Sequence, residues 1–516
     1  MSRDQASAQR KQVNGTKRPE LKKKQQRVRD LRSRGDTRRA LNTAAELAKE
    51  YPNDPECHFL LGLTLTDFQR FEAGQKCLER SLELAPKNHG LRLAVCQAML
   101  ETAEFEKLLD QSDNWSSLPK VAQDMGAVRA AALCELGRRS EAELVAKQIL
   151  SSAPQSLSVY RHLLGYGLTS HDERFGRWLE KHLSGDGTWE GEKLAEGYFL
   201  LADYYHQRGE HEKALTAYID ANEKARPLLA RKFNRPYRAE QEEKSVASIT
   251  KNFPAEKLNN EPTASVSDNI TRPVFILGMP RSGKSLVEYA IGAHPRVSAK
   301  RELPPFTVLG LSLERKTGKT MSQVLGLLDA KQRATIGARY LKAIQSSEVT
   351  EPWSTDTNPI NLRGAGFLWA TVPGSRIVLI KRDPLDLAFA NFAKFMPRFP
   401  HGQLPLFETG HRTRMMLSLI DFWAENLGDR CLVVEYESFV REPEVHTRRV
   451  LELLDLPWDD SCRPAEKKRV VASNNVDSRE RAAPDEQFVG LAAPYRKWLE
   501  PMIEGLGEYG ERYRQN

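Results

Sequence analysis

The 516-residue sequence predicts an α + α/β fold, in which an N-terminal α-solenoid is followed by a three-layer α/β domain with a mainly parallel sheet. Two patterns indicate this division. In the first half, prolines and small residues recur at intervals of 34 residues, as in stacked helical repeats. In the second half, short apolar runs alternate with helical patterns, as in parallel sheets covered by helices. A chain of this length also exceeds what one hydrophobic core usually organises.

Residues 1–34 are predicted to be a basic disordered tail. They contain twelve Lys or Arg and three Asp or Glu residues, so the net charge of +8 resides in this stretch and the rest of the chain is close to neutral. Few apolar residues are available for burial, and the stretch lacks the apolar core of a secretory signal. A solvated arm is the expected state, and contact with nucleic acid or an anionic surface is the less favoured alternative.

Residues 35–230 are predicted to form helical repeats. Pro52, Pro86 and Pro154 lie at multiples of 34 residues from one another, and a small residue lies twelve positions before each. A small residue lets the two helices of a repeat pack closely, and proline ends the second helix. The pattern resembles the tetratricopeptide repeat (TPR), which implies an α-solenoid of about five units that binds a peptide or protein partner. A generic helical domain that only supports the second half is the alternative.

The α/β domain is predicted to span residues 271–516, after a polar linker at residues 231–270. Its first strand, "RPVFILGMP", leads through a glycine-containing loop into the helical pattern "SLVEYAIGAHP". Two further strand–helix pairs begin with "RIVLIKRDP" and "CLVVEYESF". Ligands of parallel sheets bind at the carboxyl ends of the strands, so the loops after these strands are the expected binding site.

Residues 278–285, GMPRSGKS, fit a phosphate-binding loop at every fixed position of G-x-x-x-x-G-K-[ST]. The helix that follows such a loop presents unpaired N–H groups to a phosphate. An enzyme that uses a nucleoside triphosphate would also need a carboxylate at a strand end for Mg²⁺, but Asp383 follows Lys381 and Arg382, which suit an anion better. Two cationic strand ends on one sheet therefore favour a ligand with two separate phosphate groups.

Cysteine spacing and hydropathy predict a cytoplasmic protein without a metal site. The sequence contains no run of 18 apolar residues, so no membrane span is predicted. Its six cysteines are scattered without metal-ligand spacing, which fits a reducing compartment and argues against both a disulfide framework and a zinc site.

Four motifs in this order resemble the sulfotransferases that use 3′-phosphoadenosine 5′-phosphosulfate (PAPS): "GMPRSGKSLVEYAIGAHPRV", "RELP", "RIVLIKRDPLDLAFANF" and "VVEYESFVREPEVHTRRVLELLDLPW". The similarity spans residues 272–510 and is greatest to bacterial proteins that join TPR repeats to a sulfotransferase domain and are related to tyrosylprotein sulfotransferases. It implies a P-loop-like domain, PAPS as the co-substrate, and transfer of the sulfuryl group to an acceptor hydroxyl. The repeats suggest a peptide or protein acceptor, with carbohydrate and small-metabolite hydroxyls as alternatives.

The resemblance also implies roles for individual residues. Glu302 corresponds to the general base that takes the proton of the acceptor hydroxyl. Arg382 corresponds to the arginine that binds the 3′-phosphate. Lys284 is not part of the family pattern, but its charge would stabilise the negative charge that develops during the transfer. The residues expected to contact the nucleotide co-substrate are Arg281, Ser282, Gly283, Lys284, Ser285, Arg382, Lys394, Tyr436, Ser473 and Lys497. No metal is expected in this site.

Three positions depart from the family pattern. Lys284 stands in place of a threonine, Ala390 in place of a serine that contacts the 3′-phosphate, and Thr357 in place of a lysine. Loss of the serine hydroxyl removes a hydrogen bond worth about 1 kcal/mol. Two alternatives to an active sulfotransferase therefore stay open. One is a catalytically weak or inactive sulfotransferase-like TPR scaffold, and the other is a P-loop kinase or ATPase that uses a nucleoside triphosphate.

Overall fold

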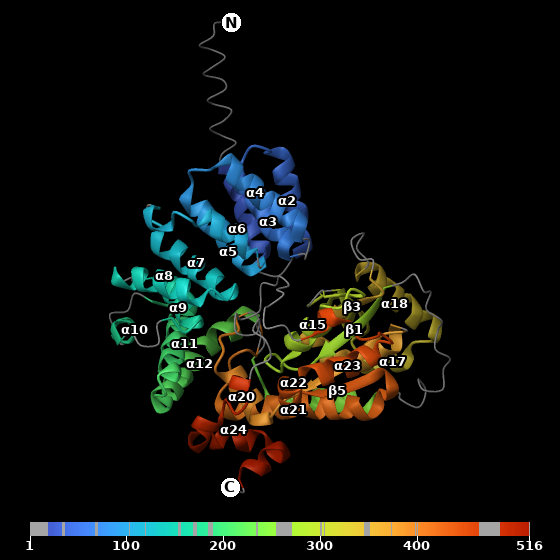
Figure 1. Ribbon diagram of the computed structural model, residues 1–516. Helices are drawn as coiled ribbons and strands as arrows, with labels where there is room; N and C mark the ends of the chain where they lie inside the picture. Colours follow the sequence, from blue (N-terminus) through green and yellow to red (C-terminus); the bar gives the residue numbers. More distant parts are fainter. Residues whose placement is uncertain are drawn as a thin grey trace, which may run out of the picture. The chain divides into compact units, whose positions relative to one another are not determined.

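In the computed structural model, the chain forms two compact units, with the boundary between residues 168 and 169 (Figure 1). The residues that the structure describes are 19–32, 37–67, 71–102, 104–118, 120–152, 156–168, 173–183, 189–233, 236–253, 271–299, 302–303, 305–344, 351–372, 374–397, 399, 401–463 and 486–514.

The first unit is built of α-helices that pack as antiparallel pairs (Figure 1). The helices are α2 (Thr37–Glu50), α3 (Pro55–Asp67), α4 (Phe71–Leu84), α5 (His89–Thr102), α6 (Phe105–Gln111), α7 (Ala122–Glu135), α8 (Arg139–Ser151) and α9 (Leu157–Gly165). The small residue predicted within the repeat has the expected function in α4. A Cβ atom on Gly74 would lie 2.9 Å from the hydroxyl of Thr66 and 3.0 Å from the carbonyl of Gly62, so α3 and α4 approach too closely for a larger residue.

Residues 19–32 form a helix, so the prediction of a disordered tail was wrong for this part of residues 1–34. Val28 is fully buried and Leu31 is 9% exposed. Val28 packs against the first repeat, in a cluster that includes Leu47. Several basic side chains of this helix form ion pairs with the repeat, including Lys24 with Glu50 at 3.0 Å. The prediction failed because it weighed the high charge of the stretch and not its apolar spacing. Residues 1–18 lie outside the described residues.

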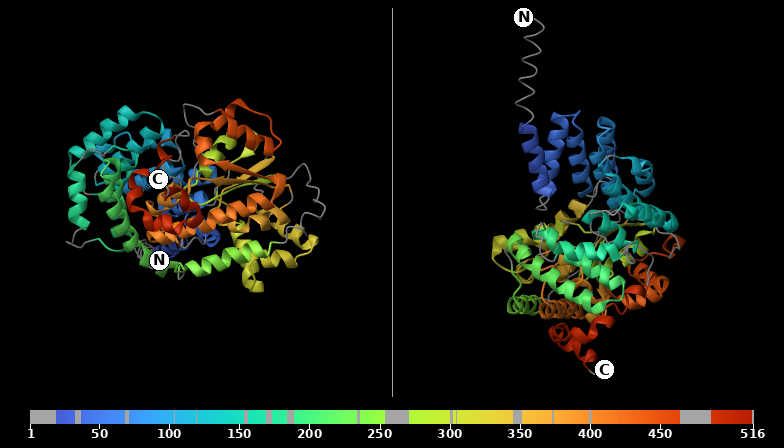
Figure 2. Two further views of the ribbon diagram at one scale, coloured as in Figure 1. Left: turned by 90° about the horizontal axis from the view of Figure 1, so that it is seen from below. Right: turned by 90° about the vertical axis from the view of Figure 1, so that its left-hand side faces the viewer.

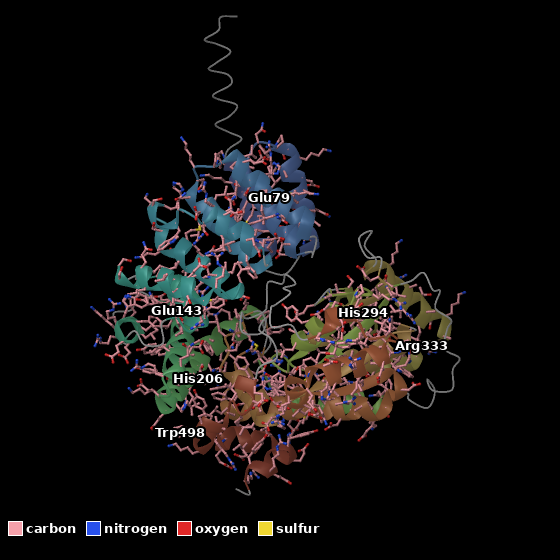
Figure 3. The ribbon with its side chains drawn as sticks, in the orientation of Figure 1. Glu79, Glu143, His206, His294, Arg333 and Trp498 are labelled. Carbon is pink, nitrogen blue, oxygen red and sulfur yellow. The ribbon has the colours of Figure 1, made fainter. Side chains whose placement is uncertain are left out.

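The second unit begins with helices that precede the sheet. They are α10 (Glu173–Leu183), α11 (Gly191–Gln207), α12 (His211–Phe233) and α13 (Ala239–Lys251). Helix α13 lies within residues 231–270, which were predicted to be a linker. It packs on the core because Val246 and Ile249 are spaced to share one buried face. The hairpin of α11 and α12 packs on the α/β domain: the amide of Asn222 donates to the carbonyl of Phe392 at 2.9 Å. His206, labelled in Figure 3, lies 2.7 Å from the hydroxyl of Tyr495.

The α/β domain contains a five-stranded sheet in which each pair of neighbouring strands is parallel. Its strands are β1 (Arg272–Leu277), β2 (Val297–Ser298), β3 (Trp353–Asp356), β4 (Arg376–Lys381) and β5 (Cys431–Glu435), in the order β2-β3-β1-β4-β5. The register pairs Phe275 of β1 with Asp356 on one side and Ile377 on the other. Together with the helical first half, this sheet confirms the predicted α + α/β fold.

Helices cover both faces of the sheet (Figure 2). The side chains of β1 alternate between the two layers: Val274 and Ile276 pack in one core cluster, and Phe275 and Leu277 in the other. The first layer is formed by α15 (Lys284–Gly292), α22 (Tyr436–Arg441) and α23 (Pro443–Leu453). The second is formed by α13, α16 (Pro305–Thr317), α17 (Met321–Leu327), α18 (Ala330–Ile344), α19 (Ala365–Thr371) and α21 (Leu406–Asn426).

The chain after residue 485 packs on helix α20 (Pro384–Phe392), which directly follows β4. This C-terminal segment contains the 3₁₀ helix η7 (Ala493–Trp498), helix α24 (Glu500–Gly505) and the 3₁₀ helix η8 (Gly507–Tyr513). Among the described residues, no helix combines the length and apolar character that a bilayer crossing requires.

Candidate functional site

The carboxyl ends of the five strands meet at one edge of the sheet, because all strands run in the same direction. Glu302 follows β2 and Thr357 follows β3. The loop at residues 278–283 follows β1, Arg382 follows β4, and Tyr436 follows β5. Residues from five separate segments are therefore brought to one edge in the order of the strands.

The loop after β1 has an unusual backbone. Arg281 has φ 69° and Gly283 has φ 97°, both in the left-handed region. A Cβ atom on Gly283 would overlap the ring of Tyr436, so both the backbone and the neighbour require glycine here. A non-glycine residue such as Arg281 in this region costs on the order of 1–3 kcal/mol, which is common in ligand-binding loops. Ser282 is fully buried, and its hydroxyl has no hydrogen-bond partner among the described residues.

Lys284 begins helix α15 and is 7% exposed. Its ammonium group turns back to the loop, where it donates to the carbonyls of Gly278 at 3.0 Å and Met279 at 2.8 Å. These bonds connect the start of the helix to the loop residues that follow β1, and they hold the positive charge of Lys284 against the loop backbone. Ser285 follows in the first turn of the same helix and is half-buried.

Arg382 links the loops after three strands. Its guanidinium donates to the carbonyl of Arg281 at 2.8 Å and lies 4.5 Å from the centre of the Tyr436 ring. A further bond runs to the carbonyl of Phe488 in the C-terminal segment at 2.6 Å. The residue is 6% exposed, and burial lowers the pKa of its guanidinium. The Nε atom of Arg382 has no hydrogen-bond partner among the described residues.

Glu302 is half-buried at the β2 end of the same edge. The residue after it, Leu303, donates its backbone N–H to the Asp356 carboxylate at 3.3 Å. Asp356 is fully buried at the end of β3, and burial raises its pKa to about 7. Sequence reasoning missed Asp356 because β3 is short and carries polar residues, so it did not resemble a strand.

The remaining predicted residues are less closely associated with this edge. Lys394 lies just beyond α20, and its carbonyl accepts from the amide of Gln403 at 2.7 Å. Lys497 is exposed on η7, with its ammonium 4.0 Å from the ring centre of Trp498, which Figure 3 labels. Ser473 lies outside the described residues.

Helix α20 holds residues that sequence reasoning did not identify. Next to the buried Ala390, the side-chain amide of Asn391 donates to the Pro280 carbonyl of the phosphate-binding loop at 2.9 Å. The Asp386 carboxylate accepts the backbone N–H groups of Gly490 at 2.6 Å and Ala492 at 2.8 Å. The sequence signals that could have identified them are the spacing of Asn391, nine residues after Arg382, and that of Asp386, one helical turn after Asp383.

Asp383, the carboxylate considered for Mg²⁺, is engaged in structural contacts. It accepts from the backbone N–H of Asp386 at 2.9 Å, from Tyr513 at 2.7 Å and from Arg512 at 2.6 Å. Among the described residues, no group of three or more His, Cys, Asp or Glu side chains is arranged to hold a metal ion.

Comparisons with known proteins identify both the helical repeats and the α/β fold. Residues 273–460 match the model of the sulfotransferase family, and residues 55–88 and 195–223 match a tetratricopeptide repeat model. These matches confirm the resemblance seen in the sequence. The chain therefore carries a helical region with TPR repeats, followed by a sulfotransferase-fold domain.

Individual relatives are distant. An uncharacterized protein of Aquifex aeolicus is 25% identical over 389 residues, which cover 73% of this chain and 49% of that protein. Protein-tyrosine sulfotransferase A of Caenorhabditis elegans is 25% identical over 205 residues, which cover 37% of this chain and 52% of that protein. The protein-tyrosine sulfotransferase of Drosophila melanogaster is 23% identical over a stretch that covers 36% of this chain and 39% of that protein. The chain spans about half the length of the curated relatives it matches.

Solved structures with similar chains include the sulfotransferase domain of the Synechococcus PCC 7002 olefin synthase. It shares 15% identity, covers 50% of this chain and 99% of that chain, and has a TM-score of 0.32. The sulfotransferase domain from the curacin biosynthetic pathway shares 14% identity and has a TM-score of 0.30. The match covers 49% of this chain and 98% of that chain.

Proposed function

We propose that this protein is a sulfotransferase that moves the sulfuryl group of PAPS to an acceptor hydroxyl. The observation that carries the proposal is the junction between the phosphate-binding loop and Arg382. The 2.8 Å bond from Arg382 to the Arg281 carbonyl brings two cationic strand ends together. A ligand with phosphate groups at both the 5′ and 3′ positions can use both ends, whereas a nucleoside triphosphate carries all of its phosphates at one position.

The polar groups at this edge fit such a ligand. The buried Ser282 hydroxyl and the Nε atom of Arg382 lack hydrogen-bond partners among the described residues, and a bound anion would supply acceptors for both. In the proposed assignment, the backbone N–H groups of the loop, Arg281 and Ser282 bind the 5′-phosphosulfate. Arg382 binds the 3′-phosphate. Further nucleotide contacts are proposed at Lys394, Tyr436, Ser473 and Lys497.

The reaction needs a base on the acceptor side. In the proposed step, the Glu302 carboxylate takes the proton of the acceptor hydroxyl while the hydroxyl oxygen forms a bond to sulfur. The bond between sulfur and the bridging 5′-phosphate oxygen breaks, so the products are a sulfate ester and adenosine 3′,5′-bisphosphate. The proton then passes from Glu302 to water. Lys284 contributes a fixed positive charge under the loop while negative charge builds on the bridging oxygen.

We further propose that the acceptor hydroxyl belongs to a peptide or protein. The TPR matches support this, because stacked helical repeats offer an extended surface for such partners. The names of the curated relatives point to protein tyrosine as the acceptor in those proteins.

Thermal-shift titration distinguishes the candidate functions. We expect adenosine 3′,5′-bisphosphate to raise the unfolding temperature, and Mg-ATP to leave it nearly unchanged. The substitution Arg382→Ala should abolish the shift. Arg430→Ala is the matched control, because Arg430 also donates to a carbonyl and lies over an aromatic ring, but at the opposite end of a strand.

Transfer of labelled sulfate from PAPS into peptides, and into a cell extract, then tests catalysis. Stabilisation by Mg-ATP alone would favour the kinase or ATPase. Binding of the bisphosphate without any transfer, unaffected by Glu302→Gln, would favour the inactive scaffold. No response to adenosine 3′,5′-bisphosphate would rule out the proposed co-substrate.

A further inference from the structure

Asp356 is a buried carboxylate whose hydrogen-bond donors are all neutral groups. Its Oδ1 atom accepts the backbone N–H groups of Leu303 at 3.3 Å and Asn358 at 3.0 Å. Its Oδ2 atom accepts the Tyr340 hydroxyl at 2.9 Å and the Asn361 amide at 3.1 Å. Burying a carboxylate without a cationic partner is unfavourable, so the four bonds must offset a large desolvation cost. Such an arrangement beside a candidate site indicates a function.

The two oxygens of Asp356 face different parts of the protein. The Oδ2 side is anchored in the core, because the Tyr340 ring is 1% exposed and packs against Phe275 and Phe306. The Oδ1 side holds the backbone of Leu303, the residue directly after Glu302. Asp356 therefore connects the rigid core to the segment that carries the proposed base.

This segment has little other support from the sheet. Among the described residues, strand β2 consists of Val297 and Ser298, and its partner strand is β3. Leu303 is instead held at both of its main-chain groups, since its carbonyl also accepts from the Asn358 side chain at 3.3 Å. Its own side chain packs against the core cluster that contains Tyr340.

We propose that Asp356 is a positioning residue that, through Leu303, holds Glu302 at the carboxyl edge of the sheet. This inference rests on the proposed function, in which Glu302 takes the proton of the acceptor. Asp356 does not touch the reacting atoms. It sets the distance and direction from the Glu302 carboxylate to the acceptor hydroxyl.

The test compares two substitutions of Asp356. Asp356→Ala removes the acceptor for Leu303, and we expect kcat to fall about 100-fold, as for a displaced catalytic group. The KM for PAPS should change less than about threefold, because the donor loop lies on other strands. Asp356→Asn should restore most of kcat, since its remaining oxygen still accepts from Leu303. The new amide can then donate to Asn361, whose Oδ1 has no hydrogen-bond partner among the described residues.

Each substitution is also made in a Glu302→Gln background. If Asp356 acts through Glu302, Asp356→Ala should lower the residual rate of Glu302→Gln by less than about twofold. Glu135→Ala is the matched control: Glu135 is another buried carboxylate that accepts a tyrosine hydroxyl, at 2.6 Å from Tyr166, but it lies in the repeat unit. We expect its kcat to equal that of the wild type.

Asn358→Ser provides a second route if Asp356→Ala fails to fold. Serine keeps an acceptor for the backbone N–H of Ile360, which Asn358 now caps, but it cannot reach the Leu303 carbonyl. We expect a smaller loss of kcat, on the order of 10-fold, that again disappears in the Glu302→Gln background.

Equal losses in both backgrounds, or a wild-type kcat in Asp356→Ala, would overturn the inference. Failure of the proposed function looks different, because the wild-type chain would then transfer no sulfate at all.

Discussion

Lys284 is the residue at which this loop departs most clearly from the family pattern, and the structure directs its ammonium to main-chain carbonyls. The bonds to Gly278 and Met279 close the loop on itself. A threonine side chain at this position could not reach both carbonyls. Lys284 thus shapes the loop in addition to any effect on the transferred group.

Lys284→Met should weaken donor binding by loosening this loop. Methionine fills a similar volume but cannot donate to the Gly278 carbonyl, and it leaves the Met279 carbonyl with the backbone N–H of Ser282 at 3.3 Å. Loss of the two bonds costs about 1–3 kcal/mol. We expect the Kd for adenosine 3′,5′-bisphosphate to rise about tenfold in isothermal titration calorimetry. Lys244→Met is the control, because Lys244 forms an exposed ion pair with Glu240 on α13. Unchanged affinity of Lys284→Met would show that the two bonds do not maintain the loop.

The raised pKa of Asp356 predicts a pH-dependent stability. Burial raises this pKa from 3.8 to about 7, so between these values the folded chain holds a proton that the unfolded chain has lost. The contribution of Asp356 to the unfolding free energy therefore falls as pH rises through this window, and it is constant above pH 7. From pH 5 to 8, the wild type should lose about 2–3 kcal/mol relative to Asp356→Asn, which has no such proton.

Native-state hydrogen exchange of the β1 and β3 amides measures this difference locally. Parallel stability curves for the two proteins across pH 5–8 would contradict the raised pKa of Asp356.

At the scale of elements, the C-terminal segment and α20 act together beside the donor loop. The motif R-D-P-L-D contributes Arg382, Asp383 and Asp386, and each of these side chains contacts a residue after position 485. The Phe488 carbonyl holds one end of the Arg382 guanidinium, while the Arg281 carbonyl holds the other. The orientation of the proposed 3′-phosphate ligand thus depends on a segment more than a hundred residues away in sequence.

Asp386→Asn should reduce the affinity for the nucleotide co-substrate, although Arg382 itself is unchanged. The Asp386 carboxylate accepts two backbone N–H groups, and an asparagine amide would turn its own N–H₂ toward one of them. We expect the segment around Gly490 to loosen and the Kd for adenosine 3′,5′-bisphosphate to rise about 5- to 20-fold, which corresponds to about 1–2 kcal/mol.

Glu243→Gln is the control for this prediction. Glu243 lies on α13 and contacts His411 and Arg414 of α21, so it connects elements at another place in the domain. An equal loss of affinity in both variants would indicate general loosening of the domain and not a specific effect at Arg382.

The elements that the sequence predicted are those with strong local patterns. Strands β1, β4 and β5 are continuous apolar runs, and the phosphate-binding loop carries its own motif. Strand β2 has two residues and β3 ends in polar side chains, so neither produces an apolar run. The importance of Asp356 follows from burial and from a contact 53 residues away, which no local pattern contains. The helix in the predicted linker was missed because a few apolar residues are enough to dock it.

At the scale of the second unit, the α11–α12 hairpin is part of the same compact body as the sheet. Its aromatic residues pack on α20 and on the residues that follow this helix: Tyr218 contacts Phe389 of α20, and Phe199 stacks on Phe395. A peptide bound to this hairpin would therefore lie on an element that also supports α20. This packing gives a structural reason for joining repeats of this kind to the domain.

A chain that starts at residue 231 should be less stable than one that starts at residue 169. The shorter chain lacks the bond from Asn222 to the Phe392 carbonyl and exposes Phe389 and Phe395. Loss of this hydrogen bond and of the two aromatic contacts should lower the unfolding temperature by on the order of 10 °C in calorimetry. Asn222→Ala in the full chain, which leaves the Phe392 carbonyl buried without a donor, should give a smaller decrease of roughly 2–4 °C. Equal unfolding temperatures for the two truncated chains would mean that the hairpin folds beside the domain without stabilising it, and that the α20 surface tolerates exposure.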